Sequence, residues 1–160
     1  MIDTKAIIEA AEEARKECTH RDPNFSALRQ ARIGNPALVK TPDGEDAYWI
    51  VPFVIETKAC GFAFVEKTLK VSRLGIFGAG PTDQASWITA SFFEKPPPEA
   101  ISDIKNRHPD MWMSEPLFSY DRNPSKWAWI VNLKNERKLT IVITPSGWYE
   151  QAARKEAVEG

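Results

Sequence analysis

The two halves of this sequence correspond when one is shifted along the other by 80 positions without a gap. The shift aligns identical residues and places one turn sequence over another, in the same order along the chain. A unit that is repeated must build the same local structure twice, which restricts the fold more than composition does. The aligned segments are Pro36 and Pro116, Asp43-Gly44 and Asn123-Pro124, Trp49-Ile50-Val51 and Trp129-Ile130-Val131, Glu56 and Glu136, and Lys58 and Lys138.

Two interpretations of this correspondence are open. Duplication of one unit explains why order, spacing and turn chemistry agree together. Alternatively, two hairpins rich in Trp, Ile and Val look alike because strands favour the same residue types. In either case each half is expected to hold a helix followed by about three short antiparallel strands, with the helix covering one apolar face of the sheet.

Two helices are expected from apolar periodicity. Residues 3–18 carry apolar side chains at helical spacing, and Asp3 or Thr4 is positioned to cap this helix. A second helix is expected from Pro98 to about Arg107, because proline suits a first helical turn. A short helix is one interpretation of residues 21–35.

Strands are expected where β-branched and aromatic residues form short runs between turn residues. Two segments stay ambiguous: residues 87–93 are a strand or a short helix, and Glu66-Lys67 is a hairpin turn or a bulge in one long strand. The expected strands are Ala37–Val39, Tyr48–Ile55, Gly61–Val65, Thr68–Leu74, Leu117–Tyr120, Trp127–Leu133 and Leu139–Thr144.

These elements predict an α+β fold in which two repeated helix-plus-antiparallel-sheet (α-β-β-β) units pack as one domain over residues 1–160. The repeat units are expected to span about residues 1–95 and 96–150, followed by a flexible tail at 151–160. A chain of 160 residues is long enough for one hydrophobic core and too short for two comfortable independent domains.

Charge and hydropathy exclude two classes of partner. The formal charge is -1 and Lys and Arg form no dense cluster, so no nucleic-acid partner is expected. The longest apolar run covers residues 47–55, whereas a membrane span needs about 20 residues, so no membrane partner is expected. The N-terminus has no basic region leading into an apolar one, and we expect a cytoplasmic protein.

No catalytic residues, metal ligands or cofactor-binding residues are predicted. Cys18 and His20 lie near each other at a helix end, but zinc usually takes four ligands and no second pair has a suitable spacing. A thiol and imidazole that act as a nucleophilic pair would also need an oxyanion loop, and none is evident. Cys18 and Cys60 are therefore interpreted as reduced thiols that pack as small apolar groups.

A glycine-rich segment at residues 75–81 carries Gly75, Gly78 and Gly80. Its glycine spacing differs from the dinucleotide fingerprint, and Pro81 follows at once where a helix should open. We interpret the segment as a flexible connection. The alternative is that its backbone N–H groups contact a small ligand in a pocket, possibly enzymatic, at the junction of the two repeat units.

Tryptophan is unusually frequent, with six residues in the chain. Large aromatic rings dominate core burial, so most of these side chains are expected in the core. Tryptophan is also enriched at protein interfaces. Alternation places Trp127 and Trp129 on one strand face, and we take Trp112, Trp148 and Trp127 as the candidate partner contacts.

The order of motifs in the first half resembles the PepSY domain, which is found in metalloprotease propeptides and in bacterial membrane and secreted proteins. Residues 98–149 are similar to it again, more weakly, and the two stretches cover most of the chain. The resemblance implies an architecture and a binding role, and the family brings no catalytic residues. The motifs that carry it are Asp43-Gly44, Tyr48-Trp49-Ile50-Val51-Pro52, Gly61-Phe62-Ala63-Phe64-Val65 and the segment Leu69–Gly75.

The sequence therefore favours a non-enzymatic binding or regulatory module. We expect it to use a sheet face or an edge strand to bind another protein, a peptide or a second copy of itself. The small-ligand pocket near residues 75–81 is the alternative.

Overall fold

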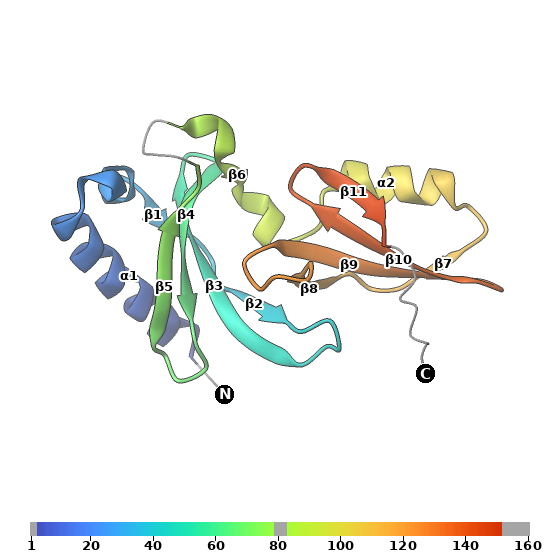
Figure 1. The fold of residues 1–160 in the computed structure, drawn as a ribbon, viewed down its shortest axis with the longest axis horizontal. Coiled ribbons are helices and arrows are strands. Elements are labelled where there is room, and N and C mark those ends of the chain that lie inside the picture. Colours follow the sequence, from blue (N-terminus) through green and yellow to red (C-terminus); the bar gives the residue numbers. More distant parts are fainter. Residues whose placement is uncertain (1–2, 79–82, 152–160) are drawn as a thin grey trace. The chain divides into compact units, whose positions relative to one another are not determined.

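The computed structural model describes residues 3–78 and 83–151, and their contacts divide into two compact units (Figure 1). Unit 1 comprises residues 1–39 and 45–95, and unit 2 comprises residues 40–44 and 96–160. The main division falls between Lys95 and Pro96. That the two units form one domain stays a prediction.

Unit 1 is one long helix on a twisted antiparallel sheet (Figure 1). The sheet runs in the order β1-β3-β4-β5, with β2 pairing with β3 and β6 pairing with β4. Its elements are α1 (Thr4–Arg21), η1 (Pro23–Arg29), β1 (Arg32–Ile33), β2 (Ala37–Lys40), β3 (Asp46–Ile55), β4 (Lys58–Val65), β5 (Val71–Ile76), η2 (Gln84–Ser86), β6 (Ile88–Thr89) and η3 (Ala90–Phe93), where η marks a 3-10 helix.

The core of unit 1 lies between α1 and the sheet. Ile7 and Ala11, four positions apart on one side of the helix, are fully buried. They join a cluster with Val51 and Phe53 of β3 and with Ala63 of β4, which all belong to one sheet face because alternate residues of a strand point to the same side. Burial of each large apolar side chain contributes about 1.5–3 kcal/mol, so this face holds the helix in place.

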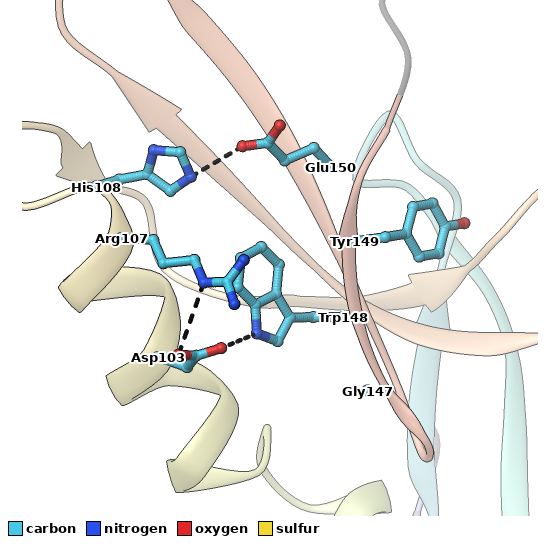
Figure 2. A pocket seen from close by; sticks show the side chains of 7 residues that line it. All are labelled: Asp103, Arg107, His108, Gly147, Trp148, Tyr149 and Glu150. Carbon is cyan, nitrogen blue, oxygen red and sulfur yellow. Dashed lines mark hydrogen bonds and ion pairs between the residues drawn. The ribbon is translucent and has the colours of Figure 1, made fainter.

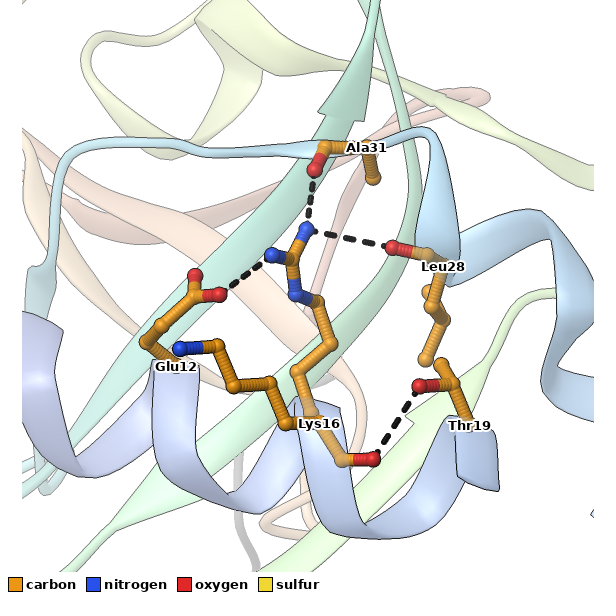
Figure 3. A network of polar contacts seen from close by, with 6 residues as sticks. Glu12, Lys16, Thr19, Leu28 and Ala31 are labelled. Carbon is orange, nitrogen blue, oxygen red and sulfur yellow. Dashed lines mark hydrogen bonds and ion pairs between the residues drawn. The ribbon is translucent and has the colours of Figure 1, made fainter. Parts of the chain in front are cut away.

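A partly buried guanidinium, that of Arg15, ties α1 to the segment that follows it (Figure 3). Arg15 donates hydrogen bonds to the carbonyl oxygens of Leu28 (3.2 Å) and Ala31, and it forms an ion pair with Glu12. Its side chain is 16% exposed. The Leu28 carbonyl also accepts a hydrogen bond from the Ala31 N–H at 3.3 Å, so the arginine adds a second donor where the chain leaves η1.

Unit 2 is a shorter helix with a five-stranded antiparallel sheet (Figure 1). The sheet runs β11-β10-β9-β7, and β8 also pairs with β9. Within the described residues β11 has one strand neighbour, β10, so it is an edge strand. The elements are α2 (Pro98–Arg107), β7 (Trp112–Met113), β8 (Leu117–Tyr120), β9 (Trp127–Lys134), β10 (Lys138–Thr144) and β11 (Gly147–Glu150).

The two sheets pair their strands in the same way. In each, two short strands pair with the long strand that follows them, and the next two strands add on the other side. The shift of 80 positions carries the pairs Arg32–Val54 and Ile33–Phe53 onto Trp112–Lys134 and Met113–Leu133. The helices differ, with 18 residues in α1 and 10 in α2, and η1 and β6 have no counterpart among the described residues of unit 2.

The α+β class with antiparallel sheets is thus confirmed, while common origin of the two units stays a prediction. The Asp3 cap is also confirmed, because the Asp3 side chain accepts a hydrogen bond from the Lys5 backbone at 3.1 Å. Helix α2 has the expected bounds. No helix in the described part of the chain has the length and hydropathy to cross a membrane.

The structure settles the two ambiguous segments. Residues 66–70 form a hairpin turn, in which the Glu66 N–H donates to the Lys70 carbonyl at 2.8 Å, so the following strand begins at Val71 rather than Thr68. Residues 87–93 contain both alternatives, because β6 is followed directly by η3. Residues 21–35 hold η1 and then β1.

Other predicted bounds were wrong. Helix α1 continues to Arg21 rather than ending at Cys18, and β4 begins at Lys58 rather than Gly61. Gly75 lies in β5 and not in a loop, because pairing with β4 continues as far as Ile76. Residues 147–150 form β11, which the sequence analysis did not identify as a strand. Pro145 and Ser146 turn the chain back so that this segment pairs with β10.

Replacing Arg15 by Met should lower the free energy of unfolding by about 1–3 kcal/mol, because the Leu28 and Ala31 carbonyls and the Glu12 carboxylate each lose one hydrogen bond. Arg21→Met is the matched control: Arg21 lies on the same helix and pairs with Glu17, but its side chain is 75% exposed, and its loss should cost under about 0.5 kcal/mol. Denaturant unfolding followed by circular dichroism measures both. Equal losses of free energy would show that the Arg15 network stabilises the fold no more than the exposed Arg21–Glu17 pair does.

Candidate functional site

A groove lies between α2 and β11 on the surface of unit 2. It consists of two hollows that share Asp103, Gly147 and Trp148. The first hollow, of about 940 Å³, extends toward the C-terminal end of α2 and is lined further by Arg107, His108, Tyr149 and Glu150 (Figure 2). The second, of about 410 Å³, extends toward the first turn of α2. We call the two together the α2–β11 groove.

The helical wall of the groove comes from one side of α2. Asp103 and Arg107 are four positions apart, so they lie one above the other on the helix surface. Ile104 between them is fully buried and anchors the helix. His108 caps the helix, its N–H donating to the Ile104 carbonyl at 3.0 Å, and Pro109 prevents a further turn.

Trp148 links the helix to the edge strand. Its indole Nε1 donates a hydrogen bond to Asp103 Oδ2 at 2.9 Å. The guanidinium of Arg107 lies 5.4 Å from the centre of the same indole, and Arg107 Nε is 3.9 Å from Asp103 Oδ1. A cation over an indole face is attracted by the ring quadrupole, so the three side chains orient one another.

A second link joins the end of α2 to the end of β11. Nε2 of His108 lies 2.9 Å from Oε1 of Glu150, with the imidazole 15% exposed. Figure 2 shows this pair and the Trp148–Asp103 bond side by side, with both strand residues pointing toward the helix. Two polar contacts thus hold α2 beside an edge strand of four residues.

Strand alternation explains which β11 side chains face the groove. Trp148 and Glu150 point to the side of α2, and Tyr149 between them points to the other side (Figure 2). The Tyr149 hydroxyl donates a hydrogen bond to the Asp121 carboxylate. Burial raises the pKa of Tyr149, and its hydrogen bond to Asp121 and the negative charge of that carboxylate raise it further.

The backbone of β11 exposes hydrogen-bonding groups along its outer edge. The Gln151 N–H donates to the Thr140 carbonyl at 2.8 Å, and the register pairs Tyr149 with Val142. In an antiparallel ladder, alternate residues direct their N–H and C=O groups toward the partner. Gln151 and Tyr149 therefore bond to β10, and the backbone groups of Trp148 and Glu150 point outward.

Of the three tryptophans chosen from the sequence, Trp148 lies in the groove. Trp112 is 64% exposed on β7, at the opposite end of the sheet order from β11, so the two tryptophans do not form one surface. Trp127 is 6% exposed on β9.

Two of the three glycines selected from the sequence, Gly75 and Gly78, lie in the described residues, and local geometry explains why each is a glycine. A Cβ on Gly75 would lie 2.8 Å from the Phe62 ring, so this glycine makes room for an aromatic side chain. Gly78 has a φ of +89°, which favours glycine, and a Cβ there would lie 2.4 Å from the Asp83 carboxylate. Gly80 lies outside the described residues.

Sequence reasoning did not identify Asp103, Arg107, His108 or Glu150 as residues of a site. The four-residue spacing of Asp103 and Arg107 and the alternation of Trp148 and Glu150 are visible in the sequence. Nothing in the sequence shows that this helix side and this strand face each other.

The described residues contain no cluster of metal ligands, and the pKa values of both cysteine thiols are raised. Within 3–78 and 83–151, no three His, Cys, Asp or Glu side chains are grouped closely enough to bind a metal ion. Both cysteines are free thiols. Burial raises the pKa of Cys60, whose thiol lies 3.4 Å from the Phe53 carbonyl, and burial with the charge of Asp22 raises the pKa of Cys18.

Comparison with known proteins adds no relative: the chain matches no family model, no curated protein and no solved structure. The resemblance to PepSY domains therefore stays a prediction.

Replacing Asp121 by Asn should lower the pKa of Tyr149 toward its ordinary value. Asn still accepts the hydroxyl hydrogen bond but removes the negative charge that opposes phenolate formation. Because the folded-state pKa is raised, Tyr149 stabilises the fold below its unfolded-state pKa, and this contribution is lost as the pH rises through the folded-state pKa. NMR titration of the tyrosine ring carbons measures the shift.

Asp110→Asn, which removes a carboxylate elsewhere in unit 2, is the control and should leave the Tyr149 titration unchanged. An unchanged Tyr149 pKa in Asp121→Asn would contradict the assigned contact.

Proposed function

We propose that this chain is a non-enzymatic binding module that takes up an extended peptide segment of a partner protein as an added strand beside β11. The observation that carries the proposal is the combination of an edge strand with outward backbone groups and a groove along the same strand. Addition of a peptide strand to a sheet edge is a common recognition mode, in which the backbone gives affinity and alternate side chains give selectivity.

The edge can make several hydrogen bonds with a bound strand. Trp148 and Glu150 each direct one N–H and one C=O outward. A net contribution of about 0.5–1.5 kcal/mol per hydrogen bond gives weak binding by itself. Side-chain contacts in the α2–β11 groove must supply the rest.

The groove is positioned to provide these contacts. Residues directly opposite on paired strands share one sheet face, so peptide residues paired with Trp148 and Glu150 place their side chains beside α2. There they meet an indole, a guanidinium, an imidazole and carboxylates, within two hollows of about 940 and 410 Å³.

Such a module agrees with the binding role that the PepSY resemblance implies. Its two free thiols agree with a reducing compartment, and we place the binding event in the cytoplasm.

Glu150→Pro should abolish peptide binding while leaving the fold intact. Proline is tolerated on an edge strand where the N–H faces away from the sheet, and it removes the N–H that a bound strand needs. Glu150→Ala is the matched control, because it removes the same carboxylate and keeps the N–H. The measurement is selection from displayed random peptides of about seven residues, an ordinary strand length, followed by binding of the selected peptides.

Peptides that bind the wild type and Glu150→Ala but not Glu150→Pro support the proposal. If no peptide is enriched on the wild type over Glu150→Pro, the edge does not bind peptides. If light scattering shows a dimer that Glu150→Pro dissociates, the occupant of the edge is a second copy of the chain instead.

A further inference from the structure

We infer that the peptide bound beside β11 is basic, with a Lys or Arg side chain entering the second hollow of the α2–β11 groove. This inference rests on the proposed function and adds the chemistry of its ligand. It comes from the charges and the shape of that hollow.

The second hollow contains carboxylates and no cation among the described residues that line it. Glu99 stands at the first turn of α2, and Asp103 follows one turn later on the same side. Pro97, Ala100 and Pro145 complete an apolar rim. A long side chain with an apolar stem and a cationic end suits this combination, because its methylene groups pack on the rim while its charge reaches the carboxylates.

Trp148 adds an aromatic wall that already lies against a cation of the protein itself. The indole borders both hollows, whereas Arg107 borders only the first. Within the protein itself, the guanidinium of Arg107 already lies 5.4 Å from the ring centre. A peptide cation in the second hollow would meet the same ring from the side that Arg107 does not line.

The charge balance along the whole groove favours the same ligand. Among the described residues, the lining includes three carboxylates, those of Glu99, Asp103 and Glu150, and one guanidinium, that of Arg107. Arg107 is already placed beside Asp103, and His108 beside Glu150. An acidic peptide would therefore meet a guanidinium that already has a partner, whereas a basic one meets a carboxylate surplus at Glu99.

Register connects the hollow to the edge strand. A peptide residue paired with Trp148 places its side chain on the sheet face that Trp148 shares with Asp103. The second hollow begins at this position and extends along Ser146 and Thr144. One basic residue at a fixed place in the peptide, rather than overall positive charge, is thus expected.

The test compares peptide selection on the wild type and on the double variant Glu99→Gln/Asp103→Asn. Asn at 103 still accepts the indole hydrogen bond, so Trp148 should keep its place, which its indole N–H resonance checks. Asp110→Asn/Glu115→Gln is the control, because it removes two exposed carboxylates of unit 2 that do not line the groove.

Peptides selected on the wild type and on the control should carry Lys or Arg at one position. Replacing that residue by norleucine should weaken binding about tenfold on the wild type and hardly at all on the double variant. Selected peptides without a basic preference would overturn the inference and leave strand addition standing. Failure of the wild type to enrich any peptide over Glu150→Pro would overturn both.

Discussion

The register between β10 and β11 is the constraint on which the functional site depends. The Gln151–Thr140 hydrogen bond and the pairing of Tyr149 with Val142 decide which β11 backbone groups are used inside the sheet. The same alternation sends the side chains of Trp148 and Glu150 toward α2 and that of Tyr149 to the opposite face. A slip of one residue would reverse both assignments at once, burying the outward backbone groups and turning the indole away from Asp103.

The two units share one pattern of strand pairing but have different helices. Both arrange two short strands and a hairpin around a long strand, and the pairs at β1–β3 and β7–β9 coincide under the same shift. In unit 1 the 18-residue α1 covers its sheet with a large apolar contact and is tied further by Arg15. In unit 2 the 10-residue α2 is held to β11 by Trp148–Asp103 and His108–Glu150, and these polar contacts line an open groove.

Periodicity and turn chemistry were sufficient to predict much of the fold. Helix α2 and strand β8 have the bounds expected from sequence, because proline and short apolar runs mark their ends. Strand β11 was missed because four residues, Gly147–Glu150, give too short a pattern, and its pairing is decided by β10 and α2. Trp148 was selected from its residue type, whereas Asp103, Arg107 and Glu150 were not, since ordinary surface charges become a site only through tertiary proximity.

Strand addition makes a claim about individual backbone amides, so amide hydrogen exchange with a selected peptide bound tests it most directly. The N–H groups of Trp148 and Glu150, which point out of the sheet, should become protected when the peptide binds. The N–H of Tyr149, already bonded within the sheet, should change little and serves as the internal reference. Peptide binding that leaves the Trp148 and Glu150 amides exchanging as in the free protein would contradict strand addition at β11.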